Sequence, residues 1–385
     1  MSQIATSSPT EDAELASLKR KVAALETQHD MIKGHDLKSA DALQTTLGRA
    51  LRRAVDLFVG PRELVQEADR RIAVLAAGEE PESTAEQEAR YKSYMKLIEH
   101  VPLIKHLLDE GESDAIQNLY RNLKKGSDNA RSDDTSKLKT AVVYWVDSAL
   151  GTSTPPLRIN SKHERGLDND VTGRLLCPSE YSWEDPIMRN NIREGHADYL
   201  VTAHSWPIFL YAGYKCDTND LEKGLLQSPL LVKAFKYIFT SPSSAAEDLP
   251  DIQSDQRPTK RARRAQTTTT RTDVARLIGL NTVTPRAIAY VAVQLRFALS
   301  NATAWRLIDI DFSHVEFYAA IVDFFETTPG PRAQASADKL LEWWNKSLDE
   351  TLEHHKSHSA LIVTQVHPWR DWPLSAKLLS TSREV

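Results

Sequence analysis

The chain has 385 residues, of which 41% are hydrophobic and 26% are charged. This length allows one large domain or two ordinary ones, and the apolar content is sufficient for a buried core. With 48 Lys plus Arg against 53 Asp plus Glu, the net charge is -5. That balance excludes steering of a polyanion by the whole molecule, so any contact with nucleic acid requires a local basic patch.

The cysteine content and the hydropathy pattern indicate an intracellular protein. Cys177 and Cys216 are the two cysteines of the chain, so at most one disulfide can form, which favours a reducing compartment. Charged residues precede any apolar run at the N-terminus, unlike a signal or transit peptide. No run approaches the roughly 18 apolar residues of a membrane span, and we expect no membrane partner.

Residues 1–12 are polar and are expected to be disordered. Residues 13–78 are predicted to form a helical arm that begins with a short coiled coil, because apolar residues recur there at alternating spacings of three and four. Such a short seam packs either on a second copy of the chain or on the protein's own core. The residues of this dimerisation seam are Leu15, Leu18, Val22, Leu25 and Ile32.

Two amphipathic helices are predicted next, from Asp41 to Val59 and from Arg62 to Ala77, separated by Gly60 and Pro61. The polar connector from Gly78 to Thr84 is interpreted as the boundary of a main domain that covers residues 85–348. That domain begins with a helix that Pro102 interrupts.

The middle of the main domain is predicted to change from helix to loop. Asp133 or Asp134 is expected to be the N-cap of a helix from Thr135 to Leu150. Residues 151–195 contain many prolines and glycines and are predicted to form a long ordered loop. Loops of this length often carry function, so this one is a candidate region.

The stretch from Ala203 to Ala245 is the densest in aromatic and apolar residues, and the core is expected to condense around it. Its helix from Pro229 to Phe239 is interpreted as the structural spine. Ser228 is predicted as its N-cap, just as Thr284 is predicted for the helix from Pro285 to Leu299 that packs against it.

The other segments complete the organisation. Residues 246–272 have an acidic half and a basic half without apolar periodicity, and are predicted to be a disordered linker inside the domain. Helices are expected from Phe312 to Glu326 and from Arg332 to Leu348, followed by a variable tail over residues 349–385. The fold class is therefore all-α: an irregular multi-helix domain with a long ordered loop, preceded by a helical, coiled-coil arm.

Several segments of the main domain form a recognisable pattern in chain order: IEHVPLIKHLL, NARSDDTSKLK, RGLDNDVTGRLLCP, TAHSWPIFLY, GLLQSPLLVKAFKYIFTSPSSA, VTPRAIAYVAVQLRFALS and LLEWWN. Together they resemble an uncharacterised domain family that is expanded in mushroom-forming (basidiomycete) fungi. The resemblance covers about residues 85–348 and implies no activity, cofactor or catalytic residue. Expansion in one lineage implies a dispensable or mobile-element-linked role.

A basic run within the linker has the charge density that a nuclear import receptor or phosphate groups bind. The alternative is a solvated linker that happens to be basic. Direct nucleic-acid binding by four clustered charges would be weak and sensitive to salt. The residues are Lys260, Arg261, Arg263 and Arg264.

The acidic cluster of Asp309 and Asp311, with His314 and Glu316 close behind, could hold a hard divalent ion for phosphoryl chemistry. The alternative is a loop in which Asp311 or Ser313 caps the next helix.

Three weaker candidates each have a structural alternative. His196 and Asp198 form an H-x-D pair, for which capping and hydrogen bonding are the expected roles. His354, His355 and His358 are expected to belong to a solvated tail. Cys177 lacks a neighbour that would depress its pKa, so no nucleophile is predicted.

These observations favour a nuclear, non-enzymatic interaction protein, associated with chromatin or nucleic acid. The first alternative is a divalent-metal-dependent phosphohydrolase or nuclease that uses Asp309, Asp311 and His314. The second is a cytoplasmic scaffold that assembles with itself through the N-terminal coil. No cofactor is predicted.

Overall fold

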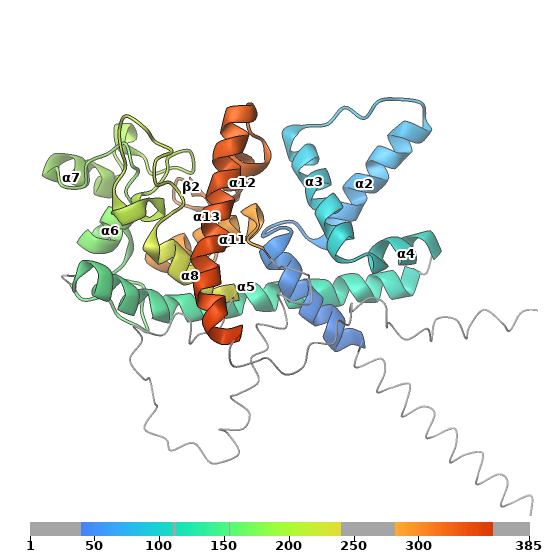
Figure 1. Ribbon diagram of the computed structural model, residues 1–385, viewed down its shortest axis with the longest axis horizontal. Coiled ribbons are helices and arrows are strands. Elements are labelled where there is room, and N and C mark those ends of the chain that lie inside the picture. Colours follow the sequence, from blue (N-terminus) through green and yellow to red (C-terminus); the bar gives the residue numbers. More distant parts are fainter. Residues whose placement is uncertain (1–39, 111–112, 154, 240–281, 357–385) are drawn as a thin grey trace, which may run out of the picture.

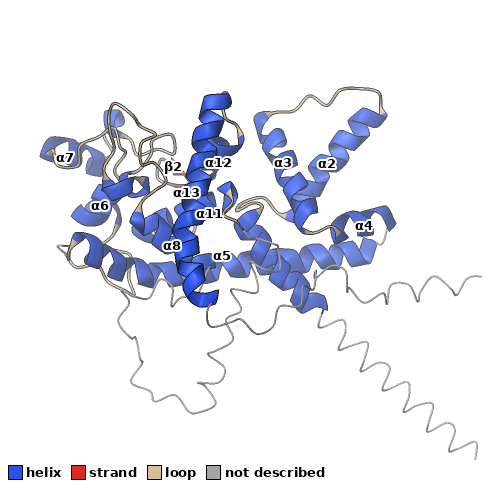
Figure 2. Ribbon diagram, in the orientation of Figure 1, coloured by secondary structure: helices blue, strands red, loops and turns tan. Residues whose placement is uncertain are grey.

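The structure is a computed structural model, and it describes residues 40–110, 113–153, 155–239 and 282–356. Within these residues the fold is helical, as predicted, and its regular strands are the two-residue β1 (Ile308–Asp309) and β2 (Phe312–Ser313), which pair antiparallel (Figures 1 and 2). The predicted seam, linker, basic run and most of the tail lie outside the described residues.

Helix α5 (Ser113–Leu150) is a long helix along the lower side of the molecule in Figure 1. The helices that contact it include α2 (Pro61–Ala76), α4 (Leu103–Glu110), α8 (Pro229–Phe239) and α11 (Pro285–Leu299). The first half of α5 contributes Ile116, Leu119 and Leu123 to one buried apolar cluster, and its second half contributes residues between Leu138 and Val146 to a larger one. The prediction that a helix starts at Thr135 is wrong, because Asp134 is buried inside α5 and is held there by tertiary contacts instead of capping an end.

The smaller cluster joins the helix over residues 40–54 to the helices that follow it. The helix before the connector and the helix after it pack on each other and contribute residues to the same apolar cluster. The predicted boundary at Gly78–Thr84 therefore falls between two helices that share a core. Pro61 begins one helix, and Pro102 separates two others, as predicted. The helices are α2 (Pro61–Ala76), α3 (Ala85–His100) and α4 (Leu103–Glu110).

Two glycines let the helix over residues 40–54 cross α5 at close range. A Cβ atom on Gly48 would collide with the backbone of Leu123, and one on Gly126 would collide with the backbone of Thr45. Gly126 therefore occupies the middle of a helix, where glycine is unfavourable, because the crossing leaves no room for a side chain.

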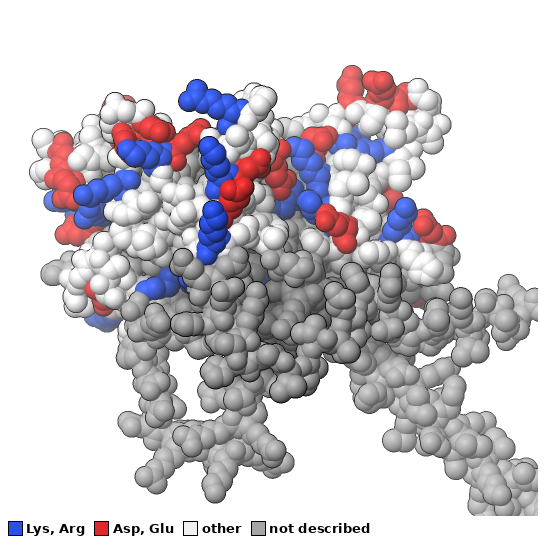
Figure 3. Space-filling view, in the orientation of Figure 1, with Lys and Arg blue, Asp and Glu red and all other residues white. Residues whose placement is uncertain are grey.

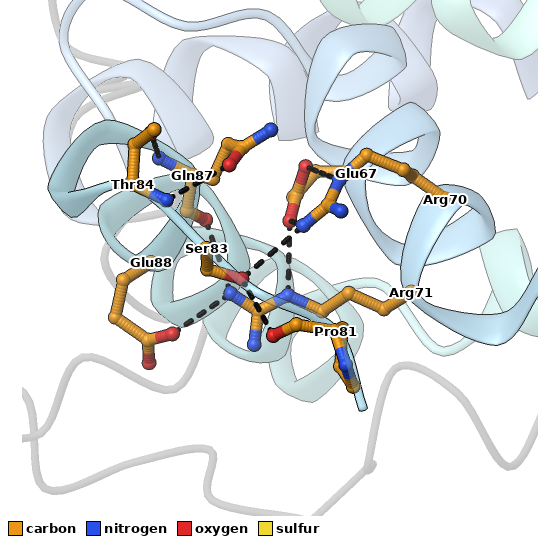
Figure 4. A network of polar contacts seen from close by, with 8 residues as sticks. All are labelled: Glu67, Arg70, Arg71, Pro81, Ser83, Thr84, Gln87 and Glu88. Atoms are coloured by element: carbon orange, nitrogen blue, oxygen red, sulfur yellow. Dashed lines mark hydrogen bonds and ion pairs between the residues drawn. The ribbon is translucent and has the colours of Figure 1, made fainter. Parts of the chain in front are cut away.

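A polar cluster fastens α2 to α3 (Figure 4). The buried carboxylate of Glu67 accepts hydrogen bonds from Arg70 at 2.8 Å and from Arg71 at 2.9 Å, and Arg71 reaches across to Glu88 at 2.8 Å. Thr84 and Gln87 form a reciprocal capping box at the start of α3. The hydrogen bonds from Arg70 and Arg71 hold the pKa of Glu67 near 2, so its carboxylate stays charged.

Helix α11 (Pro285–Leu299) is the centre of the larger cluster, and every residue from Arg286 to Leu299 is buried. It contacts α5, α6, α8 and α12. The predicted contact with α8 (Pro229–Phe239) is therefore confirmed, but α11 is the more enclosed of the two helices. Thr284 caps α11 and Ser228 bonds the N–H of Leu231 at the start of α8, as predicted.

The last helices begin and end differently from the prediction. Helix α12 (His314–Glu326) begins after Ser313, whose hydroxyl accepts from the N–H of Glu316, while the expected first residues belong to β2. Ser313 is thus the cap, and Asp311 is not. Helix α13 (Pro331–Lys356) runs beyond the predicted end at Leu348.

Residues 151–195, predicted as a long ordered loop, contain two short α-helices and one 3₁₀ turn, and three more 3₁₀ turns follow before residue 228. Trp183 lies against Gly173, where a Cβ atom would not fit. The elements are η1 (Gly166–Asp168), α6 (Asp170–Leu176), α7 (Pro186–Glu194), η2 (Ala197–Tyr199), η3 (Ile208–Leu210) and η4 (Ala212–Tyr214).

Buried ion pairs join the two clusters. Arg53 makes two bonds to Asp134, at 2.7 and 2.9 Å, and the hydroxyl of Tyr290 donates to the same carboxylate at 2.9 Å. Burial by itself would lower the pKa of Arg53, but the adjacent carboxylate raises it above its ordinary value. Helices from three parts of the chain meet at this carboxylate.

A second buried ion pair lies at the start of α11. Arg286 forms a bidentate pair with Glu326 at 2.9 and 3.0 Å and also donates to the carbonyl of Val55 and the hydroxyl of Ser93, each at 2.6 Å. Because all of these partners lie on other elements, Arg286 fixes α11 relative to α12, α3 and the end of the first described helix.

The junction at Asp134 gives a stability prediction. Substituting Asp134→Ala leaves the charge of Arg53 buried without a carboxylate, so the free energy of unfolding should fall by about 3–5 kcal/mol. Equilibrium unfolding in urea measures this. Asp133→Ala is the matched control, because the pair of Asp133 with Arg49 is partly exposed and should cost less than about 1 kcal/mol. Equal losses for the two variants would contradict the assignment.

Candidate functional site

The C-terminal end of α11 is surrounded by buried cationic side chains. Lys162 donates to the carbonyls of Phe297 and Ala302, and Arg165 donates to the carbonyl of Ala298 at 2.8 Å. Helix C-termini carry unpaired carbonyls and partial negative charge, which cations stabilise. Burial, followed by the charge of Arg165, lowers the pKa of Lys162 to about 7. These contacts fasten the end of α11 to the segment that contains Lys162 and Arg165.

Arg296, in the last turn of α11, connects this end of the helix to the β1–β2 hairpin. Its guanidinium lies 3.5 Å from the Asp309 carboxylate, 3.4 Å from Nε2 of His314 and 3.3 Å from the centre of the Phe312 ring. Burial lowers the pKa of Arg296 to about 10. This value is still well above neutral pH, so the guanidinium remains charged there. Because arginine only donates, Nε2 of His314 must be the acceptor.

Trp305 closes the other side of His314. The two rings are stacked with centres 5.5 Å apart, and Trp305 also contacts the rings of Phe297 and Phe58. Burial, and then the charge of Arg296, lower the pKa of His314 to about 4. His314 is therefore neutral at physiological pH and is enclosed by aromatic rings and a cation.

The residues of the predicted metal cluster are engaged differently from one another. Asp309 pairs with Arg296, His314 is buried beside the same guanidinium, and Asp311 is exposed in the turn of the hairpin. Among the described residues, no group of three His, Cys, Asp or Glu side chains is placed to hold a metal ion. The divalent-metal phosphohydrolase stays a prediction from the sequence.

The hairpin turn presents apolar side chains outward. Ile310 is 84% exposed and has φ of 58°, in the left-handed region that β-branched residues rarely adopt. Leu307 and Ile308 are also exposed beside it. The hairpin tip is therefore an exposed apolar group in a strained conformation, and the pair of Arg296 with Asp309 holds its base. This tip is the candidate functional site of the described domain.

Sequence analysis did not identify this tip, because the signal for it appears only once the pairing of the hairpin is known. A two-residue hairpin turn normally contains Gly or Asn, since these residues tolerate positive φ. Here the turn residues are Ile310 and Asp311. A β-branched residue in such a turn therefore indicates a constraint other than local stability.

The weaker candidates have structural roles. Nδ1 of His196 accepts from the N–H of Asp198 at 3.3 Å, so His196 has the predicted hydrogen bond, but it is His196 and not Asp198 that caps η2. Cys177 is buried, and burial raises the pKa of its thiol to about 12. In the region of residues 151–195, the described polar groups hold turns together, as Asn169 and Asp185 do by capping α6 and α7.

The fold and the site define an all-α, multi-helix domain with an apolar hairpin tip. A family model described as "Family of unknown function (DUF6698)" matches residues 125–348, so the chain belongs to that family. The match begins inside α5, later than the predicted start of the domain at residue 85. No curated protein and no solved structure matches the chain. None of the helices in the described ranges has the length and apolar character to cross a membrane.

The environment of His314 gives a prediction about pH. The unfolded chain binds a proton near the ordinary pKa of 6.5, whereas the folded chain does so only near 4. Folding stability should therefore decrease as the pH falls from about 6.5 to about 4, by an amount on the order of 3 kcal/mol attributable to this residue.

Urea unfolding at a series of pH values measures this effect. The His314→Gln variant should show a shallower pH dependence than the wild type in this interval. His204→Gln is the control for the replacement of a histidine, because the His204 side chain is largely exposed. The same slope in the wild type and in His314→Gln would contradict the prediction.

Proposed function

We propose that this chain is a nuclear, non-enzymatic interaction protein whose helical domain binds a protein partner through the tip of the β1–β2 hairpin. The observation that carries the proposal is the exposure of Ile310 in a left-handed conformation. A water-exposed isoleucine with positive φ loses stability twice, through hydration of its side chain and through backbone strain. A partner that buries the side chain offsets the first cost.

The base of the hairpin supports the same proposal. Interfaces gain most of their binding energy from a few apolar anchors that are already ordered before binding. Arg296 holds β1 through Asp309 and lies over Phe312 in β2. Little conformational freedom is therefore left to lose when the tip is buried.

The nuclear part of the proposal comes from the sequence. The run of Lys260, Arg261, Arg263 and Arg264 has the composition that a nuclear import receptor recognises. We include in the proposal an association with chromatin or nucleic acid, a link to mobile elements, and membership of a family expanded in mushroom-forming fungi.

The first test removes the tip without disturbing the fold. Ile310→Gly deletes the side chain, and glycine adopts φ of 58° without penalty. Affinity purification of the full chain from its source cells, with nuclease treatment and quantitative mass spectrometry, should recover a protein partner with the wild type and at least about tenfold less with the variant.

The control for this test is Ile187→Ala, which removes another exposed isoleucine at the start of α7. It should recover the same partner in the same amount as the wild type. Equal recovery with Ile310→Gly would exclude the hairpin as the binding site. Recovery that depends on intact nucleic acid would assign the contact to nucleic acid instead of protein.

The second test concerns import. The full chain fused to a fluorescent protein should accumulate in nuclei, and the ratio of nuclear to cytoplasmic fluorescence should fall severalfold when Lys260, Arg261, Arg263 and Arg264 are replaced by Ala. Substitution of Lys124 and Lys125, which are exposed on α5, is the control for loss of basic charge. Exclusion of the intact protein from nuclei would reject the proposal.

A further inference from the structure

The last turns of α2 expose apolar side chains that no other described element covers. Ile72 is 62% exposed and Leu75 is 59% exposed, and their spacing of three places them on one side of the helix. Ala73, Ala76 and Ala77 beside them are exposed as well. We call these five residues the α2 end. A protruding helix end with this composition is typical of a binding surface.

The loop that follows the α2 end is acidic. Glu79, Glu80 and Glu82 are exposed, and none of them forms an ion pair with another described residue. Figure 3 shows acidic side chains gathered at the upper right, where Figure 1 places the loop between α2 and α3. We call these three residues the acidic loop. Apolar and negatively charged groups are thus adjacent at one protruding corner.

The nearby arginines do not neutralise the acidic loop. Arg70 and Arg71 are bonded to Glu67, and Arg71 also pairs with Glu88 (Figure 4). The guanidinium of Arg71 lies 4.0 Å from the centre of the Tyr91 ring. The last turn of α2 also contains no basic residue. The partial negative charge of the helix C-terminus therefore adds to the charge of the acidic loop.

We propose that the α2 end and the acidic loop bind a basic, amphipathic helix of a protein partner. The apolar stripe of such a helix covers Ile72 and Leu75, and its Lys or Arg side chains pair with the glutamates. This proposal adds a second contact surface to the proposed function. It rests on the proposed function in one respect, namely that the chain binds a protein partner.

The negative charge of the acidic loop argues against other binding partners at this surface. Nucleic acid and an anionic membrane both repel three carboxylates and a helix C-terminus. A second copy of the chain in a two-fold contact would bring the same acidic loop against itself, and like charges placed opposite one another weaken an interface. A cationic apolar helix matches both features of the surface.

The test uses the full chain and a fluorescent synthetic peptide of Leu and Lys arranged as an amphipathic helix. Fluorescence anisotropy should show saturable binding that weakens with salt. A peptide of the same composition in scrambled order, and one with Glu in place of Lys, should bind at least about tenfold more weakly.

Two variants of the chain locate the contact. Ile72→Ser combined with Leu75→Ser should reduce affinity about tenfold or more, and Glu79→Lys with Glu80→Lys and Glu82→Lys should do the same while abolishing the weakening by salt. The matched control is Ile187→Ser with Glu184→Lys at the start of α7, where Ile187 is 73% exposed, and it should bind like the wild type.

Each other outcome overturns the proposal. Equal binding by all variants places the peptide elsewhere, and absence of binding to the wild type rejects the surface. A wild-type mass in sedimentation that falls by half with Ile72→Ser and Leu75→Ser identifies a face between two copies. The variant at Lys260 to Arg264 should bind the peptide normally, so failure of nuclear import and failure of this surface are distinguishable.

Discussion

The burial of α11 is the constraint on which the rest of the structure depends. A helix enclosed on all sides can keep polar side chains only if each one has a partner, because an unpaired buried charge costs several kcal/mol. Arg286, Tyr290 and Arg296 point to three different partners: Glu326, Asp134 and Asp309. The positions of α12, α5 and the β1–β2 hairpin therefore follow from the polar residues of one helix.

The same constraint shapes where chemistry and recognition can occur. The ionisable groups that reach α11 are occupied in fastening helices, and burial lowers the pKa of His314 so far that it carries no charge at neutral pH. Exposed apolar side chains at the hairpin tip and at the α2 end remain accessible to a partner, and these two places lie well apart in the structure (Figure 1). Both proposed surfaces consist of exposed apolar side chains on elements that ion pairs fasten to a neighbouring helix.

The candidate site was only partly accessible to sequence reasoning. Asp309 and His314 were recognised as unusual because acids and a histidine are close together in the chain, but the residue that determines their state is Arg296, which belongs to a helix that reads as apolar. Ile310 was missed because the sequence does not show whether a hydrophobic residue is exposed or buried. Its position in a two-residue turn exists only once Ile308 pairs with Ser313.

The sequence by itself determined the all-α class and the starts of several helices. Caps at Thr84, Ser228, Thr284 and Ser313 act within one turn of the chain, so their effect is local and can be read from neighbouring residues. Only the tertiary structure decided that α5 continues through Asp134. That carboxylate is a good cap in isolation, but a guanidinium 81 residues earlier holds it inside a helix. A contact between residues so distant has no local signature, and it outweighs a preference worth about 1 kcal/mol.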